Sequence, residues 1–178
     1  MEKKPKKRIS KFYCIWFQFS KFDNQKLNKI KRIVNNRLKG PNFSIHLPAI
    51  GPYLQLDKEE FEKIEKISRK IKKFKISLIE YKLSNQKFTS FYVQVKKTKN
   101  LITEKNKFSK TNYIKQNKKY NPHISLYYGI KNKKTKESII KKLPKLNRLV
   151  TIDKLCIVDV DEKINKWKII KTIKLKNE

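Results

Sequence analysis

The sequence has few of the residues that usually build disulfide frameworks or metal sites. Cysteine occurs only at Cys14 and Cys156, which are far apart and each lie inside an apolar run. Disulfide-rich folds and zinc sites with closely spaced ligands need more cysteines than this. We therefore expect two buried free thiols in a reducing compartment, with no metal ion and no other cofactor.

Long apolar runs and glycine are also scarce. No apolar stretch approaches the ~20 residues that cross a bilayer, and three glycines argue against a loop that cradles phosphate through backbone N–H groups. The basic start, residues 1–8, is not followed by an apolar signal segment with a small-residue cleavage site. We expect no membrane partner and a cytoplasmic location, with the nucleus as the alternative because such a start also fits a nuclear signal or an RNA-binding arm.

Acidic residues are few, with 15 Asp and Glu against 47 Lys and Arg, so the formal net charge is +32. A field of this size attracts polyanions such as RNA. However, lysine, asparagine, isoleucine, phenylalanine and tyrosine are all heavily used while arginine is rare, which is typical of an AT-rich genome. We attribute about half of the excess charge to that bias. The charge therefore supports a nucleic-acid partner without proving one.

What the sequence does have is enough apolar material for one core. The chain has 178 residues, of which 38% are hydrophobic and 11% aromatic, and this suits a single domain with a buried interior. We expect a basic disordered leader over residues 1–11, one folded domain over residues 12–178, and a monomer.

Hydrophobic periodicity predicts alternating strands and helices. Strands are expected over residues 12–19, 43–48, 76–83, 88–95, 123–129, 150–160 and 166–175, with the second strand ending at Gly51-Pro52. Helices are expected over residues 27–38, 57–74 (with Asp57 as N-cap), 96–120 and 138–143. The order is β-α-β-α-β-β followed by α-β-α-β-β, which describes two similar halves. We therefore predict an α+β fold of two pseudo-symmetric lobes, each an antiparallel sheet with helices on its outer face, forming a central cleft.

Each half contains one histidine, His46 or His123, and the chain has no others. An imidazole titrates near neutral pH, so one ring can remove a proton from an attacking hydroxyl or water while the other protonates the leaving oxygen of a phosphodiester. The alternative is that both are ordinary structural histidines that happen to lie in strands.

A serine lies two positions from each histidine, and side chains two apart share a face of a strand. Ser44 shares a face with His46, and Ser125 shares one with His123. Their hydroxyls are candidates to hold phosphate oxygens, in which case no metal is required. Tyr127 also faces this side if the strand is regular.

The segment Pro122-His123-Ile124-Ser125-Leu126-Tyr127-Tyr128 resembles one motif of the two-histidine (2H) phosphoesterases, also called LigT-like proteins, which carry a pair of H-x-[S/T] motifs on strands. The similarity is greatest to the cyclic nucleotide phosphodiesterase branch, with its aromatic first strand and a Trp, here Trp167, in the closing strand. It spans residues 12–175. The first motif departs from the pattern because Pro48 stands where the family has Thr or Ser, and proline offers neither a hydroxyl nor an N–H.

The resemblance implies roles for individual residues. His46 and His123 would form the acid/base pair, and Ser125 would bind phosphate. Ser44 would substitute for the hydroxyl missing from the first motif. Tyr128 is a candidate for ordering water or substrate, with Tyr127 as the alternative, and core packing is an equally good interpretation of either tyrosine.

Together these observations predict a metal-independent phosphodiesterase that acts on 2′,3′-cyclic phosphates or related phosphodiesters of RNA ends or nucleotides. Three alternatives stay open. The first is an enzyme that trims RNA 3′ ends, although both motifs keep their hydroxyl in that branch. The second is a catalytically weakened RNA-binding module, which holds single strands by charge and stacking. The third is a protein that is basic only through genome bias, which predicts scattered charge and no cleft.

Overall fold

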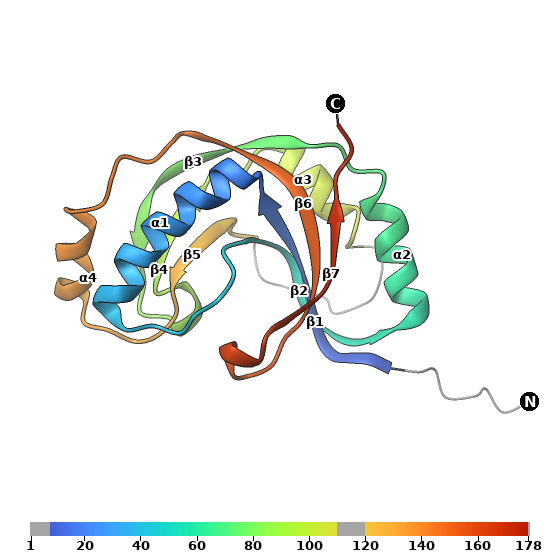
Figure 1. The fold of residues 1–178 in the computed structure, drawn as a ribbon, viewed down its shortest axis with the longest axis horizontal. Helices are drawn as coiled ribbons and strands as arrows, with labels where there is room; N and C mark the ends of the chain where they lie inside the picture. The colour runs from blue at the N-terminus through green and yellow to red at the C-terminus, as the bar shows by residue number, and fades with distance from the viewer. Residues whose placement is uncertain (1–7, 110–119, 178) are drawn as a thin grey trace, which may run out of the picture.

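The computed structural model describes residues 8–109 and 120–177, and its elements follow the predicted order (Figure 1). The strands are β1 (Arg8–Phe19), β2 (Leu47–Asp57), β3 (Phe74–Leu83), β4 (Phe91–Val95), β5 (His123–Tyr127), β6 (Leu149–Asp159) and β7 (Lys168–Lys174). The helices are α1 (Lys21–Leu38), α2 (Lys58–Ser68), α3 (Lys99–Asn106) and α4 (Lys133–Ile140), with short 3₁₀ turns η1 (Lys87–Thr89) and η2 (Ile164–Lys166). The predicted α+β class is confirmed.

The strands form an antiparallel sheet in the order β2-β1-β6-β3-β4-β5, and β7 pairs with β6 outside this order. Strand β6 pairs with β1 along one edge, and its other edge is divided between two partners. Residues 149–152 pair with β3, whereas residues 154–159 pair with β7. The division produces the two predicted lobes, one built on β1, β2, β6 and β7 and the other on β3, β4 and β5.

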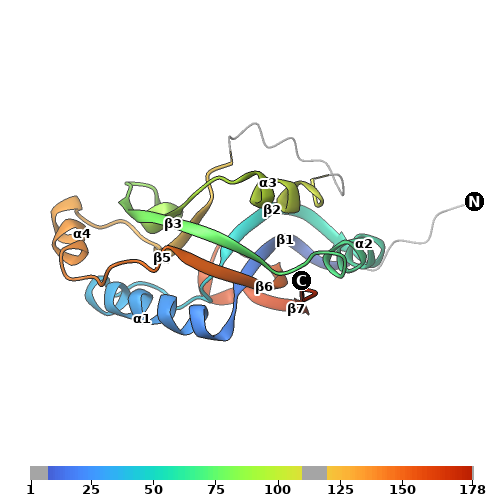
Figure 2. The same ribbon diagram turned by 90° about the horizontal axis from the view of Figure 1, so that it is seen from above.

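The helices lie outside the sheets. Helices α1 and α4 lie beside the lobe of β3, β4 and β5, and α2 lies at the opposite end of the molecule, beside β2 (Figures 1 and 2). Helix α1 therefore follows a strand of one lobe and packs against β5 of the other. This exchange ties the two halves of the sequence together.

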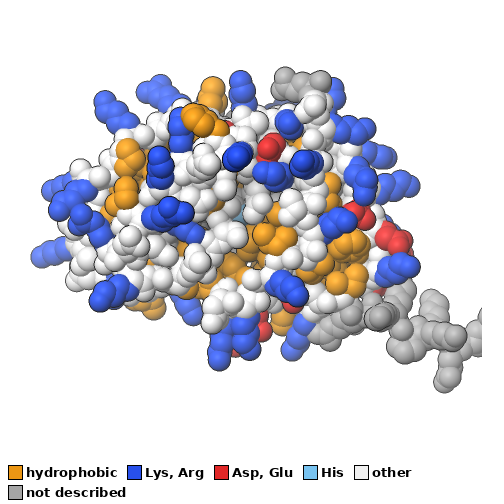
Figure 3. Space-filling view, in the orientation of Figure 1, with side chains coloured by type: hydrophobic (Ala, Val, Ile, Leu, Met, Phe, Trp, Pro, Cys, Tyr) orange, Lys and Arg blue, Asp and Glu red, His pale blue; other side chains and the backbone are white. Residues whose placement is uncertain are grey.

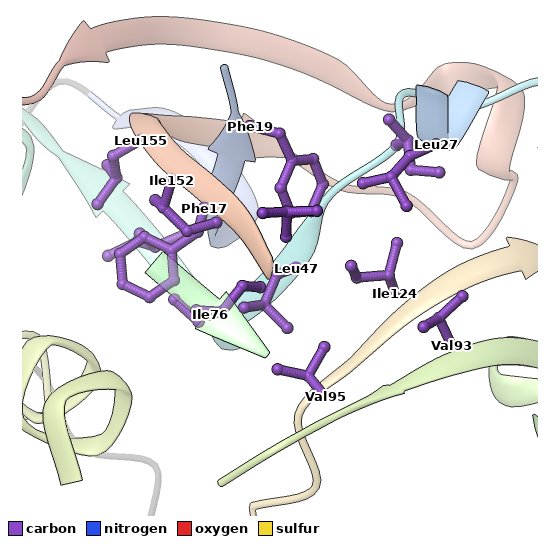
Figure 4. Close-up of a cluster of buried hydrophobic side chains, with 14 of the residues drawn as sticks. Phe17, Phe19, Leu27, Leu47, Ile76, Val93, Val95, Ile124, Ile152 and Leu155 are labelled. Atoms are coloured by element: carbon purple, nitrogen blue, oxygen red, sulfur yellow. The ribbon is translucent and has the colours of Figure 1, made fainter. Parts of the chain in front are cut away.

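One hydrophobic core runs through both lobes. Alternate side chains of β1 point into it, including Ile15 and Phe17, which are fully buried. Figure 4 shows side chains from both lobes facing this interior, among them Leu47, Val93 and Ile124. Each such side chain contributes about 1.5–3 kcal/mol by leaving water, so the core fixes the lobes relative to each other.

Two predicted boundaries in the first lobe are wrong. The strand β1 begins at Arg8, which pairs with Asp57, so the structure contradicts disorder for residues 8–11, and residues 1–7 lie outside the described part of the chain. The second strand begins at Leu47 rather than at residue 43 and continues through Gly51-Pro52 to Asp57. The Gly51-Pro52 peptide is cis and falls at a register shift between β1 and β2, so this pair makes an irregularity within the strand rather than its end.

Two predicted helices are shorter than expected. Asp57 is the N-cap of α2, as predicted, and its side chain accepts a hydrogen bond from the Glu60 N–H. The helix ends at Ser68, however, and Phe74 already belongs to β3. Helix α3 covers only Lys99–Asn106 of the range 96–120, of which residues 110–119 lie outside the described part.

Both cysteines are free thiols, as predicted, although only Cys156 is fully buried and Cys14 is partly exposed. Within residues 8–109 and 120–177, none of the helices has the length and apolar character needed to span a bilayer.

The first prediction concerns Asp23, whose buried carboxylate accepts hydrogen bonds from the Ser20 hydroxyl and the Thr151 N–H, both at 2.8 Å. Replacing Asp23 by Ala leaves a buried N–H of β6 without this partner, so we expect the free energy of unfolding to fall by about 2–3 kcal/mol. Urea denaturation measures this. The control is Glu62→Ala, which removes an exposed helix carboxylate paired with Lys58 and should cost less than about 0.5 kcal/mol. Equal effects of the two substitutions would show that Asp23 does not join α1 to β6.

Candidate functional site

The two histidines occupy equivalent places at the starts of two strands. His46 is the residue directly before β2, and His123 is the first residue of β5. The strands β2 and β5 approach each other, and a charge on His123 is close enough to His46 to lower its pKa. The structure therefore brings the two imidazoles into one region between the lobes.

Each imidazole is held by the same kind of hydrogen bond. Nδ1 of His46 lies 2.6 Å from the carbonyl oxygen of Ser44, and Nδ1 of His123 lies 2.8 Å from that of Asn121. A carbonyl only accepts, so Nδ1 carries the proton and, in the neutral ring, Nε2 holds the free lone pair. Neither Nε2 has a hydrogen-bond partner among the described residues. Both rings therefore present a nitrogen that can accept a proton.

Aromatic rings surround His46. The Trp16 indole stacks on it with ring centroids 3.6 Å apart and planes 6° apart, while Phe43 and Trp167 lie at 6.5 Å with their planes steeply inclined. The side chain is 3% exposed. Solvent therefore reaches only a small part of this side chain.

Burial sets the protonation of both rings. The pKa of His46 is lowered to about 3, mainly because burial disfavours the charged form, and the positive charges of His123 and Lys31 lower it further. The Ser44 carbonyl acts in the opposite direction. Burial also lowers the pKa of His123, although this side chain is more exposed than His46. Both rings are therefore neutral at pH 7 in the free protein.

The second motif groups Ser125 with Tyr128. The Ser125 side chain is 2% exposed, and its hydroxyl lies 3.3 Å from the Phe88 carbonyl oxygen and within hydrogen-bond reach of the Tyr128 hydroxyl. Tyr128 follows the last residue of β5. Tyr127 packs against Gly40 and Gly129 instead. The fit is so close that a Cβ atom added to Gly40 would lie 2.5 Å from the Tyr127 ring, and one added to Gly129 would lie 2.4 Å from the Tyr127 hydroxyl. The ring of Tyr127 thus fills the space that these two glycines leave.

The first motif lacks a matching hydroxyl. Pro48 lies opposite Trp16 in the sheet, and its carbonyl accepts a hydrogen bond of 2.9 Å from the Tyr120 hydroxyl. Ser44 is exposed, and the contact it makes with His46 uses its backbone carbonyl rather than its hydroxyl. The two motifs are therefore equivalent in the placement of the imidazole but not in their hydroxyl groups.

Further aromatic residues join the lobes beside the histidines. Phe43 and Tyr128 have ring centroids 4.2 Å apart, and Trp167 lies 5.6 Å from Tyr128 and 6.4 Å from Phe88. Sequence reasoning missed Phe43, Phe88 and the position of Trp16. A signal for Trp16 was present, because it alternates with the core residues of β1 and so must face away from the core.

An open pocket of about 370 Å³ adjoins His46 through the rings of Trp16, Phe43 and Trp167. It lies between α1, the segment 42–45 and the connection of β6 to β7. Its other lining residues are Gln18, Asn24, Asn28, Lys31, Asn42, Ser44, Ile45, Val158, Ile164, Asn165 and Ile169. We call it the amide pocket because five of its residues carry side-chain amides. Within the described ranges, no three His, Cys, Asp or Glu side chains are grouped so that they could hold a metal ion.

On the face seen in Figure 3, the basic side chains do not gather in one place. Lys and Arg are scattered over this face, while a histidine is visible near the centre among hydrophobic and uncharged atoms. The positive charge on this face is therefore spread rather than focused in a basic groove.

Solved structures show which fold this is. LigT of E. coli in its apo form aligns over 93% of this chain and 98% of its own, with 14% identity and a TM-score of 0.59. This chain has a LigT-like fold. The complex of E. coli LigT with 3′-AMP gives 12% identity over 95% and 99% of the two chains and a TM-score of 0.60. The protein TT0787 of Thermus thermophilus gives 12% identity over 94% and 99%, with a TM-score of 0.55.

Sequence comparisons alone find no such relation, since neither a family model nor a curated protein matches the chain. The likeness to LigT therefore lies in the fold, and it agrees with the fold that the resemblance implied. The fold by itself does not assign an activity to this chain.

The second prediction concerns the protonation of the two rings. On titration from pH 8 to pH 4, His46 should stay neutral with the proton on Nδ1, because its folded pKa is about 3. His123 should titrate below its usual value of about 6.5 but above His46. Long-range ¹H–¹⁵N NMR of the imidazoles measures both, and the spectrum of a His123→Ala variant assigns them. A normal pKa for His46 would show that its ring is not enclosed as described.

Proposed function

We propose that the protein is a metal-independent phosphodiesterase that acts on 2′,3′-cyclic phosphates or related phosphodiesters of RNA ends or nucleotides. The observation that carries this proposal is the matched pair of imidazoles. His46 and His123 come from equivalent places in two lobes, each with Nδ1 fixed by a carbonyl two residues upstream and Nε2 left free. Two such nitrogens on either side of a phosphate can move the two protons of hydrolysis.

The two environments favour different roles. We assign His46 as the base, because burial and nearby positive charge keep it neutral in the free protein. A phosphate anion bound beside the ring would raise its pKa toward the range in which Nε2 can remove a proton from the attacking water. We assign His123 as the acid. It is more exposed, and a bound phosphate anion would raise its pKa and so favour the protonated ring. Water oxygen bonds to phosphorus, the bond from phosphorus to a ribose oxygen breaks, and that oxygen takes the proton from His123.

The second lobe would also hold the phosphate. Ser125 lies two residues from His123, and its hydroxyl is close enough to the Tyr128 hydroxyl to oppose the rise in the Tyr128 pKa that burial causes. A hydroxyl aimed at a phosphate oxygen stabilises the charge that develops there. We therefore propose Ser125 as a phosphate ligand and Tyr128, rather than Tyr127, as the residue that positions it. We also keep Ser44 as a candidate phosphate ligand, because its hydroxyl is exposed and could reach a bound phosphate.

The comparisons support nucleotides as the substrate class. Structures of E. coli LigT exist with 3′-AMP, ATP, NADP⁺ and phosphate. A chain with the same fold and a histidine at each of two equivalent positions is suited to ligands of this kind. The net charge of +32 would draw such anions toward the protein at low ionic strength.

The third prediction is that hydrolysis of 2′,3′-cyclic nucleotides proceeds undiminished in EDTA and depends on both histidines. His46→Ala and His123→Ala should each lower kcat/KM by about 10²–10⁴-fold, because each removes one proton-transfer group. Product formation is followed by liquid chromatography with the four cyclic nucleotides and with RNA that ends in a cyclic phosphate. A control, Lys58→Ala, changes an exposed lysine of α2 and should leave kcat/KM within twofold.

Loss of activity in EDTA, or full activity of the His123→Ala variant, would contradict the proposed mechanism. A wild-type protein that binds RNA but hydrolyses none of these substrates would instead favour the RNA-binding module. Release of nucleotides from an unmodified RNA 3′ end would favour the trimming enzyme.

The fourth prediction uses the adjacent tyrosines as a matched pair. Tyr128→Phe removes the hydroxyl that lies close to Ser125, so we expect kcat/KM to fall about tenfold through loss of positioning. Tyr127→Phe makes the same chemical change in a ring that packs against Gly40 and Gly129, so kcat/KM should change less than twofold. Steady-state kinetics on a cyclic nucleotide compares them. If Tyr127→Phe has the larger effect, the phosphate site lies on the other side of β5.

A further inference from the structure

The amide pocket beside His46 has the character of a recognition site. It is lined by five side-chain amides, from Gln18, Asn24, Asn28, Asn42 and Asn165, together with two indoles and one lysine. We propose that this pocket binds the nucleobase next to the reacting phosphate and prefers bases that carry an exocyclic carbonyl, namely guanine, uracil and cytosine, over adenine. The inference rests on the proposed function for the position of the phosphate.

The pocket and His46 share a wall. The Trp16 ring stacks on His46 at 3.6 Å and also lines the pocket, and the same is true of Phe43 and Trp167 at 6.5 Å from the imidazole. Neither imidazole lines the pocket, but Ser44 and Ile45, the two residues that precede His46, do. In the arrangement that we propose, the phosphate lies at His46 and the base enters the pocket past these two residues. The volume of about 370 Å³ lies within the range of small-molecule sites, which starts at roughly 300 Å³.

The amides are free to bind a ligand. Asn28 donates a hydrogen bond to the Asn24 carbonyl at 2.9 Å. In the described part of the chain, the other four amide side chains make no hydrogen bond to protein. A side-chain amide offers both donors and an acceptor, which matches the mixed edges of a nucleobase. A base that enters the pocket can therefore form hydrogen bonds with these amides.

Lys31 makes the pocket selective. Its side chain is 5% exposed, its ammonium donates to the Phe43 carbonyl, and it lies 4.5 Å from the centroid of the Phe43 ring. An ammonium has three N–H donors and the structure gives this one a single acceptor among the described residues. A buried cation gains from a further acceptor. A base carbonyl supplies one, as in the contacts of lysine with guanine O6, whereas adenine has an amino group at that position.

The indoles provide the stacking surface. The Trp167 N–H donates to the Asp161 carbonyl at 2.7 Å, which orients a ring that is only partly buried. Nucleobases stack on aromatic side chains of this kind. Trp16 and Trp167 are also the only tryptophans of the chain, so the intrinsic tryptophan fluorescence of the protein comes from this pocket alone.

The first experiment is a fluorescence titration of the His123→Ala variant, which should bind ligands without turning them over. We expect 2′,3′-cyclic GMP to quench the tryptophan emission in a saturable way, with a dissociation constant about tenfold lower than that of 2′,3′-cyclic AMP. The base-free analogue, 1-O-methylribose 2,3-cyclic phosphate, should bind more weakly than both. Equal affinities for all three ligands would overturn the proposal.

The second experiment tests the amides directly. Asn42 and Asn165 are exposed, so replacing both by Ala should not disturb the fold. In the His123→Ala background, this pair should weaken 2′,3′-cyclic GMP at least fivefold and leave the base-free analogue unchanged. The matched control replaces Asn36 and Asn85, which are exposed and outside the pocket, and should change neither. An unchanged affinity for 2′,3′-cyclic GMP in the Asn42, Asn165 variant would also overturn the proposal.

Failure of the pocket and failure of the proposed function give different results. If the wild-type protein distinguishes the bases by fluorescence but hydrolyses none of the ligands, the proposed base pocket is supported and the proposed phosphodiesterase activity is contradicted. If the wild-type protein hydrolyses cyclic nucleotides and the base-free analogue with equal kcat/KM, the phosphodiesterase activity is supported and the proposed base pocket is contradicted.

Discussion

The divided edge of β6 is the constraint on which the arrangement of the molecule depends. Residues 152–159 of β6 pair with β1 on one side, and the other side of the strand pairs first with β3 and then with β7. The sheet therefore continues into both lobes, and its two end strands, β2 and β5, approach each other. Since His46 and His123 lie where these strands begin, closure of the sheet brings together two residues that are far apart in sequence. The core that fills both lobes holds this closure in place.

The environment of the imidazoles is mainly aromatic, with Lys31 as a nearby charge, although the protein as a whole is strongly basic. Lysines are scattered over the surface, so they attract an anion from a distance but do not select its position. Close to the rings, aromatic side chains exclude water and lower both pKa values. A phosphate that enters such a place is stabilised by few but fixed donors, and each counts for more than it would in water. Attraction and chemistry thus depend on different parts of the molecule.

Much of the fold could be predicted because it depends on local periodicity. The order of strands and helices and the N-cap at Asp57 follow from spacing and capping alone. The extent of β2 could not be predicted, because its pairing with Arg8–Phe19 decides it, and that partner is distant in sequence. Likewise, alternation along β5 favoured Tyr127, but the chain leaves the strand before Gly129 and brings Tyr128 to Ser125. A long-range pairing decided the first outcome, and the point at which β5 ends decided the second.

Pro48 gives the two lobes different capabilities. The second lobe has a serine two residues from its histidine, with the Tyr128 hydroxyl close to that serine, whereas the first has a proline whose carbonyl accepts a hydrogen bond from Tyr120. The first lobe instead surrounds its histidine with indoles that also line the amide pocket. In the reaction that we propose, the second lobe would therefore hold the phosphate oxygens and the first would hold the base. A pseudo-symmetric fold of this kind needs only one lobe with hydroxyl groups, because the substrate itself is asymmetric, with a phosphate at one end and a base at the other.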